Sequence, residues 1–267
     1  MIHFLLFEII VLAIIQGIAE FLPVSSSGHL VVASSIFDAF GDKLPEILSV
    51  EIVLHFGTLL AILVFYWKRI LRLLTSDRRV IPLLIVGSIP AGLVGILLKD
   101  YIEVIFQEPI FAGVFLIVTG GILLWSKRHQ AGEIECRDLS YRSALIIGAA
   151  QAFAILPGIS RSGSTIVAGL GVGMRRDEAA TFSFLLAIPA IGGAGLIHLK
   201  DLLENPAAQT TPISWLLIGG LVSFVIGLAA LAWLVRWIQE GRLQLFAWWL
   251  FVLGPAVIVW QLVLMLM

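Results

Sequence analysis

The first apolar stretch of the chain ends in the sequence QGIAEFLPVSSSGH, which occupies residues 16–29. Proline removes an amide hydrogen that a helix interior needs, and serine favours helix starts, so one helix should end near Pro23 and another begin near Ser25. The apolar piece that follows, residues 30–40, is too short to cross a bilayer. The sequence therefore predicts a helical hairpin that enters the membrane and leaves it on the same side, a course allowed where protein or a water-filled cavity covers the backbone.

A second copy of this pattern lies later in the chain. Apolar residues 143–156 lead into PGISRSGST at residues 157–165, and the apolar piece after it, residues 166–174, is again too short to cross. The turn Ser-Ser-Ser-Gly-His at 25–29 recurs as Ser-Arg-Ser-Gly-Ser at 160–164. Such polar clusters are rare at membrane depth, so their recurrence indicates an internal repeat.

Six other stretches are apolar over about the 20 residues that a membrane-spanning helix requires. They are residues 47–66, 80–98, 110–125, 180–199, 213–235 and 245–267. We therefore expect a single all-α polytopic membrane domain whose halves, 1–134 and 135–267, each contain one re-entrant helix hairpin and three transmembrane helices. Because three crossings reverse the direction of the chain, the halves should have inverted topology, as in many secondary transporters.

The composition agrees with a membrane protein. Hydrophobic residues make up 60% of the 267 positions and charged residues only 13%, about half the fraction typical of soluble domains. This excludes an ordinary soluble domain and a disordered chain. The net charge of −1 and the lack of a basic stripe argue against a nucleic-acid partner. Cys136 is the single cysteine, so the chain has no internal disulfide.

The basic residues predict the orientation. With six spans and two hairpins, 13 of the 17 basic residues fall on one side, which should therefore be cytoplasmic. They are Lys68, Arg69, Arg72, Arg78, Arg79, Lys127, Arg128, Arg137, Arg142, Arg175, Arg176, Arg236 and Arg242. Lys43, Lys99 and Lys200 fall on the other side, and Arg161 lies in the second hairpin. The first hairpin should then enter from outside and the second from the cytoplasm, so that their tips meet near the midplane.

The polar residues of the two tips suggest a phosphate site. Intramembrane charges are costly and are candidates for function, and arginine suits bidentate phosphate binding. Serine or histidine can attack phosphorus, and helix N-termini favour anions. The candidate catalytic residues are Glu20, Ser26, His29 and Arg161. The candidate substrate-binding residues are Gln16, Ser25, Ser27, Ser160, Ser162, Gly163 and Thr165.

Other interpretations of the same residues stay open at this point. Serines in membrane helices often bond back to their own helix, and Arg161 could pair with Glu20 only to lock the hairpins together. His55 is either structural or lines a cavity. A carrier, such as a flippase or an anion transporter, could use the same inverted repeat without a nucleophile.

The two tip sequences, QGIAEFLPVSSSGH at 16–29 and LPGISRSGST at 156–165, resemble those of the undecaprenyl-diphosphate phosphatase family, the integral-membrane type linked to bacitracin resistance. The length, the order of the segments and the run FSFLLAIP at 182–189 are also similar, so the resemblance covers nearly the whole chain.

The resemblance implies hydrolysis of a C55 polyprenyl diphosphate to the monophosphate and phosphate, which recycles the lipid carrier for peptidoglycan synthesis. It implies a multi-pass protein of the bacterial inner membrane, a site open to the periplasm, a homodimer, and a divalent cation, Mg²⁺ or Ca²⁺. By position, Ser26 or His29 matches the nucleophile region, Arg161 the phosphate clamp, and Glu20 the metal or acid–base carboxylate. Gln16 stands where the family often has glutamate, so a metal site of Glu20 and Gln16 has one charge fewer.

Overall fold

The computed structural model describes residues 2–39, 47–106, 108–128, 132–204 and 211–266. Within these ranges the regular elements are helices, joined by one isolated backbone pairing between Ile134 and Met174. The helices are α1 (Ile2–Ala19), α2 (Ser26–Ala39), α3 (Ile47–Phe65), α4 (Trp67–Leu73), α5 (Val80–Leu97), α6 (Lys99–Phe106), α7 (Pro109–Trp125), α8 (Tyr141–Phe153), α9 (Arg161–Gly171), α10 (Arg176–Glu204), α11 (Ile213–Gln239) and α12 (Phe246–Leu266), with the short turns η1 (Ser126–Arg128), η2 (Cys136–Asp138) and η4 (Leu243–Leu245).

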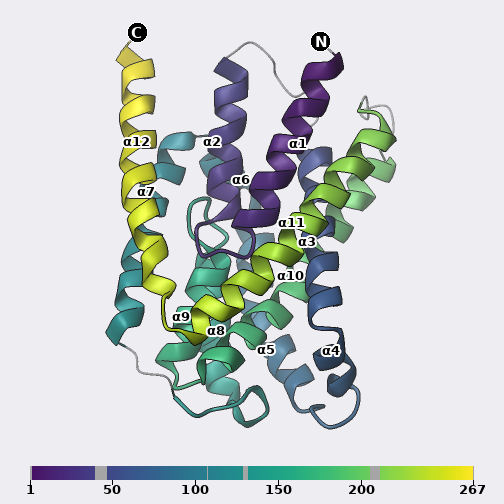
Figure 1. The fold of residues 1–267 in the computed structure, drawn as a ribbon, viewed down its shortest axis with the longest axis vertical. Coiled ribbons are helices and arrows are strands. Elements are labelled where there is room, and N and C mark those ends of the chain that lie inside the picture. The colour runs from purple at the N-terminus through teal and green to yellow at the C-terminus, as the bar shows by residue number, and fades with distance from the viewer. Residues whose placement is uncertain (1, 40–46, 107, 129–131, 205–210, 267) are drawn as a thin grey trace.

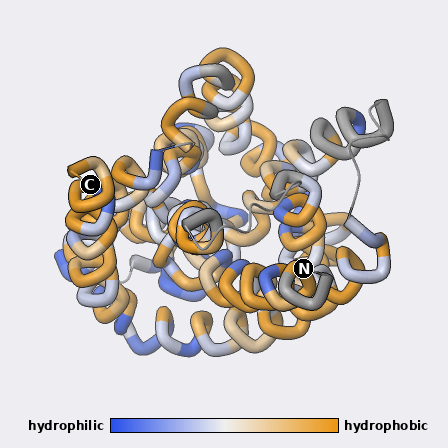
Figure 2. Tube along the Cα trace, turned by 90° about the horizontal axis from the view of Figure 1, so that it is seen from above, coloured by the Kyte–Doolittle hydropathy of each residue, from blue (hydrophilic) through white to orange (hydrophobic). Residues whose placement is uncertain are grey.

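Five helices of the described residues are long and apolar enough to span a membrane. They cover Val80–Leu97, Pro109–Arg128, Arg176–Leu196, Ile213–Gln239 and Leu243–Leu266. These agree with five of the six expected spans and identify a multi-pass membrane protein. Hydrophobic residues predominate along the helices, as Figure 2 shows.

The expected span at 47–66 corresponds to α3, but the bend that follows this helix was not predicted. The chain bends by 73° between α3 and α4, so the pair forms a sixth span only if the two pieces are counted together. The bend falls at Tyr66, which has neither a proline nor a glycine beside it. The short helix α6 was also not predicted, because its polar positions interrupt the apolar pattern after α5.

The two halves of the sequence interlock through their small residues. α1 packs along α11, and α8 packs along α5, so the first helix of each hairpin rests on a long helix of the other half. A Cβ added at Gly17 of α1 would lie 2.9 Å from the Cβ of Ile226. One added at Gly148 of α8 would collide with the backbone of Gly87. The absence of side chains at these glycines therefore allows close approach of the helices.

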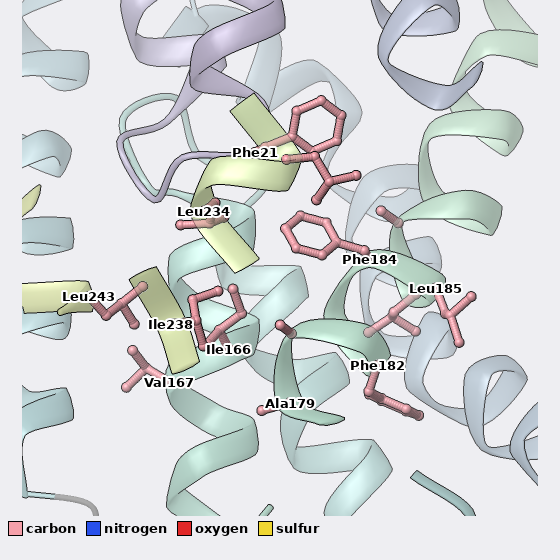
Figure 3. Close-up of a cluster of buried hydrophobic side chains, with 14 of the residues drawn as sticks. Phe21, Ile166, Val167, Ala179, Phe182, Phe184, Leu185, Leu234, Ile238 and Leu243 are labelled. Carbon is pink, nitrogen blue, oxygen red and sulfur yellow. The ribbon is translucent and has the colours of Figure 1, made fainter. Parts of the chain in front are cut away.

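Figure 3 shows the buried apolar cluster beneath the hairpins, to which Phe21, Phe184, Leu234 and Ile166 contribute. The rings of Phe21 and Phe184 meet edge to face with centroids 5.8 Å apart. Because Phe21 follows Glu20 directly, this contact fixes the backbone that carries the carboxylate.

An ion-pair cluster joins the halves at the end of the molecule that holds α4, opposite both termini in Figure 1; we call it the α4 end. Arg69 of α4 contacts Asp77 at 2.9 Å and Glu178 of α10 at 3.1 Å. Glu178 also accepts a hydrogen bond from the backbone amide of Cys136 at 2.8 Å. Burial, together with the Glu178 charge, raises the pKa of the Cys136 thiol. Lys43, expected on the opposite side, lies outside the described residues.

Candidate active site at the hairpin tips

The first tip is a tight turn between α1 and α2. Ser25 is its capping residue, because its Oγ accepts a hydrogen bond from the Gly28 amide at 3.2 Å and its carbonyl accepts one from the His29 amide at 3.2 Å. Ser25 has a φ of 71°, in the left-handed region that residues other than glycine rarely adopt. Such strain is kept where the surroundings hold it, and it is common at functional sites.

The second tip, between α8 and α9, uses the same cap. Ser160 Oγ accepts from the Gly163 amide at 3.1 Å, and its carbonyl accepts from the Ser164 amide at 2.9 Å. Gly158 takes the left-handed backbone here, with a φ of 99°, and a Cβ at this position would collide with the carbonyl oxygen of Ala112.

The two tips touch each other, as the sequence predicted. The Gly158 amide donates to Ser25 Oγ at 3.1 Å, and Ser162 Oγ donates to the Leu22 carbonyl at 3.3 Å. A Cβ on Gly28 would lie 2.9 Å from the Cα of Gly158, so the two backbones are nearly in contact. In Figure 1 the purple α1–α2 connection and the teal α8–α9 connection lie next to each other at mid-height.

Thr119 of α7 supports the second tip and was not singled out from the sequence. Its Oγ1 donates to the Gly158 carbonyl at 2.7 Å and accepts from the Ser160 amide at 3.0 Å. Thr119 is fully buried, so these bonds satisfy backbone groups that water does not reach.

The carboxylate of Glu20 is the centre of the site. Oε1 accepts a hydrogen bond from Arg161 at 2.7 Å. Oε2 accepts one from Ser26 Oγ at 2.8 Å and one from the side-chain amide of Gln16 at 3.0 Å. Glu20, Ser26, Gln16 and Arg161 therefore form one connected group, although Arg161 is 141 positions from Glu20 in the sequence.

The Arg161 guanidinium is held between the tip and α10. It donates to the Ser183 carbonyl at 3.4 Å, and its Cζ lies 6.0 Å from the ring centroid of Phe184. Its side chain keeps 15% of its surface exposed, against 6% for Glu20. The pair is thus nearly buried, with more of the remaining exposure on the cation.

His55 of α3 also lies beside Glu20. Its Nε2 is 3.8 Å from Glu20 Oε2, and its Nδ1 donates to the Glu51 carbonyl at 2.8 Å. This leaves Nε2 facing the carboxylate, and 34% of the side chain is exposed. No local sequence motif surrounds His55, although a histidine in an apolar span is itself uncommon.

His29 points elsewhere. Its Nδ1 lies 2.8 Å from the Ser25 carbonyl, and its Nε2 accepts a hydrogen bond from the indole of Trp249 at 3.0 Å. The two rings stack at 19° with centroids 6.2 Å apart. Both ring nitrogens are therefore engaged, and the structure places His55, not His29, against the carboxylate.

Comparison with known sequences decides the family. The sequence model of the family described as "Bacitracin resistance protein BacA" matches residues 9–256 of the chain. The chain belongs to the BacA family.

Similar proteins share nearly the whole length of this BacA-family chain. An undecaprenyl-diphosphatase of Rhodopirellula baltica is 48% identical over 96% of the chain and 98% of the relative. Proteins with the same name from Methanosphaera stadtmanae and Halothermothrix orenii are each 40% identical, over 96% and 95% of the chain and 98% and 97% of the relatives, respectively.

Several predicted substrate-binding residues of the BacA-family chain stabilise the structure of the tips. Ser160, Ser162, Gly163 and Thr165 are all buried, and Thr165 Oγ1 donates back to the Arg161 carbonyl at 2.8 Å. Ser27 is half-buried and pairs with Ser25 Oγ at 3.3 Å. Direct contact of these residues with a substrate stays a prediction.

The predicted metal residues of the BacA-family chain provide few ligands. The described residues hold no group of three or more His, Cys, Asp or Glu side chains that could bind a metal ion. Gln16 Oε1, however, is buried without a hydrogen-bond partner, next to the Glu20 carboxylate. One carboxylate and one amide oxygen fit a hard cation that takes its other ligands from phosphate and water.

Proposed function

We propose that the chain hydrolyses undecaprenyl diphosphate to undecaprenyl phosphate and inorganic phosphate, and so recycles the lipid carrier of cell-wall synthesis. The names of its BacA-family relatives support this activity. One observation connects this activity with particular residues. Ser26 and Arg161 donate hydrogen bonds to the two different carboxylate oxygens of Glu20.

Arg161 is the proposed phosphate clamp. A diphosphate brings several negative charges, and stabilising them is most of what phosphoryl transfer requires of a protein. The guanidinium can keep one N–H on Glu20 and direct others to the phosphate, because arginine has five donors. The N-termini of α2 and α9 begin beside it and add partial positive charge.

Ser26 is the proposed nucleophile. Its hydroxyl already donates to Glu20, which is therefore placed to take the proton as Oγ bonds to the terminal phosphorus. The bond from that phosphorus to the bridging oxygen breaks, and undecaprenyl phosphate leaves. Water then hydrolyses the phosphoserine, which releases inorganic phosphate and restores Ser26. His55 Nε2 lies close enough to Glu20 to exchange a proton with it after a small movement.

Glu20 and Gln16 would hold the divalent cation, Mg²⁺ or Ca²⁺, that the family resemblance implies. Such an ion supplies additional neutralisation of phosphate charge. Because Gln16 provides no charge, we expect Gln16→Glu to lower the cation concentration needed for half-maximal activity, by about tenfold. Titration of Mg²⁺ and Ca²⁺ into metal-free protein checks this. If Gln16→Glu needs the same or a higher cation concentration for half-maximal activity, Gln16 is not a ligand of the cation.

The proposed topology has both hairpins re-entrant, with inverted halves and the tips near the midplane. The short helices α2, α8 and α9, and the contact of the tips at mid-height, support it. The basic residues Lys68, Arg69 and Arg72 of α4 favour a cytoplasmic α4 end, which leaves the site open to the periplasm. Labelling of single cysteines at positions 27 and 72 by a membrane-impermeant reagent in whole cells tests this, with position 27 expected to react.

We further propose that the protein works as a homodimer, as the family resemblance implies. Its mass in detergent, measured by light scattering with the detergent contribution subtracted, should be twice that of the 29.1 kDa chain. A monomer of full activity would contradict this.

The decisive experiment measures phosphate release by the purified protein from polyprenyl diphosphate in detergent. Activity without a membrane distinguishes an enzyme from a flippase or an anion transporter, because transport has no meaning in a micelle. Failure to release phosphate from any prenyl diphosphate with any divalent cation would contradict the enzyme.

A further inference from the structure

A polar cavity lies at the α4 end of the molecule, away from the hairpin tips. It has a volume of about 240 Å³ and lies among η1, α9, α10, α11 and η4. Lys127 and Arg176 contribute cationic groups, and Ser126 and Gln244 contribute polar ones. Among the described residues that line it there is no aspartate or glutamate.

Some basic residues near this end are paired with a carboxylate, and others are not. Arg69, Arg175 and Arg242 each pair with a carboxylate, at 2.9 Å from Asp77, 2.6 Å from Asp177 and 3.1 Å from Glu240, respectively. Lys127 and Arg176 have no ion pair with the part of the chain that the structure describes. The cavity therefore has uncompensated positive charge.

The Arg176 guanidinium lies against the backbone of the turn that follows α11. Gly241, which ends α11 with a φ of 71°, lies against it, and a Cβ there would be only 3.1 Å from the guanidinium carbon. Glycine thus provides both the left-handed turn and the space for the guanidinium. The guanidinium therefore lies close to the backbone of this turn, at the wall of the cavity.

The surroundings indicate which anion fits. Lys127 and Gly241 lie at or just beyond the ends of two candidate membrane spans, Pro109–Arg128 and Ile213–Gln239. Trp233 and Trp237 occupy the last turns of the second span, with ring centroids 4.7 Å apart. Tryptophan is enriched at the level of the lipid headgroups, and basic pockets between helices at that level bind anionic headgroups.

We propose that this cavity binds the phosphate of an anionic phospholipid, through Arg176 and Lys127. The site is separate from the hairpin tips and does not depend on the proposed hydrolysis. α9 connects the two regions, because Arg161 begins this helix and Leu170, near its other end, lines the cavity. A lipid bound there covers the end of the helix that carries the phosphate clamp.

The test compares binding of dioctanoyl phosphatidylglycerol, dioctanoyl phosphatidylcholine and inorganic phosphate to the full-length protein in a non-ionic detergent, by native mass spectrometry. We expect the anionic lipid to bind about tenfold more tightly than the zwitterionic one. Arg176→Gln and Lys127→Gln should each weaken binding of the anionic lipid about tenfold and leave the zwitterionic lipid unchanged.

Arg78→Gln is the matched control, since it removes an exposed cation at the same end but outside the cavity, and it should bind as wild type. Because Lys127 is exposed, Lys127→Gln serves if Arg176→Gln does not fold. Equal binding of the two lipids, or of the variants and wild type, overturns the proposal. Inorganic phosphate that binds as tightly as the anionic lipid also overturns it, because the cavity would then be a site for free anions.

Discussion

The two hairpin tips share one backbone plan and carry different chemistry. Ser25 and Ser160 both cap the second helix of their hairpin, and each is followed two residues later by a serine whose hydroxyl lies 3.3 Å or 3.2 Å away. The first residue of that helix is Ser26 in one tip and Arg161 in the other. These two equivalent residues donate to the two oxygens of the same carboxylate, Glu20.

The difference shows how a repeated scaffold becomes an asymmetric site. The caps and the contact between the tips set the positions, and a single residue at the start of each helix decides whether that tip supplies a hydroxyl or a cation. Glu20 has an apolar counterpart, Ile155, because each lies four residues after a glutamine, Gln16 or Gln151, and five before the capping serine of its tip. One tip therefore holds the acid and the proposed nucleophile, while the other holds the clamp.

The largest expected effect comes from Arg161→Lys. Lysine retains the charge beside Glu20, so the fold should remain, but it loses the fork of donors that holds both the carboxylate and a phosphate. We expect phosphate release to fall about 10³-fold while the thermal unfolding midpoint changes little.

If Arg161 only locks the hairpins together, lysine should restore near-normal activity. Arg161→Ala is a less clear test, because it leaves a buried carboxylate without its partner, which costs about 3–5 kcal/mol of stability.

Ser26→Ala should reduce phosphate release by at least about 10²-fold, because it removes the proposed nucleophile. Ser35→Ala is the matched control on the same helix and should cost less than about threefold, since Ser35 Oγ donates only to the Val31 carbonyl of its own helix. Trapping of a phosphorylated protein in acid, present in wild type and absent in Ser26→Ala, checks the covalent step. An unaffected Ser26→Ala would point to direct attack by water.

His55→Gln should lower activity about 10²-fold if His55 exchanges a proton with Glu20. Trp249→Phe removes the N–H whose hydrogen bond His29 accepts, keeps a smaller aromatic ring beside His29, and should cost about fivefold. Measuring kcat for both variants separates the two histidines. A larger loss of kcat for Trp249→Phe than for His55→Gln would indicate that His29, and not His55, acts as the base.

The smallest effect concerns the caps. Ser160→Ala should lower stability by about 1 kcal/mol, the usual value for a helix cap. Ser25→Ala should lower it more, because Ser25 Oγ also accepts from the Gly158 amide of the other tip. Thermal unfolding in one detergent compares the two variants, and equal losses would mean that the contact between the tips adds little.

The sequence was most informative where polar residues interrupt apolar ones. The Pro, Ser and Gly clusters predicted both tips, and the rarity of charge predicted that Glu20 and Arg161 would meet. The end of the span at 47–66 was predicted, but the 73° bend into α4 was not, because no proline or glycine marks it. The partners of the two histidines were also missed, since Trp249 is 220 positions from His29 and no local pattern connects them.

The interlocking of the halves also determines when the site can form. α1 leaves the ribosome long before the helix it packs along, because α11 begins only at Ile213. Glu20 likewise lacks its partner until Arg161 is synthesised, 141 residues later. At about 5–20 residues per second, the first hairpin spends roughly ten seconds or more in the membrane without its partners. Under the proposed function, the nascent chain is therefore inactive until its second half is inserted, and a chain truncated before α9 would hold the acid and the serine without the cation.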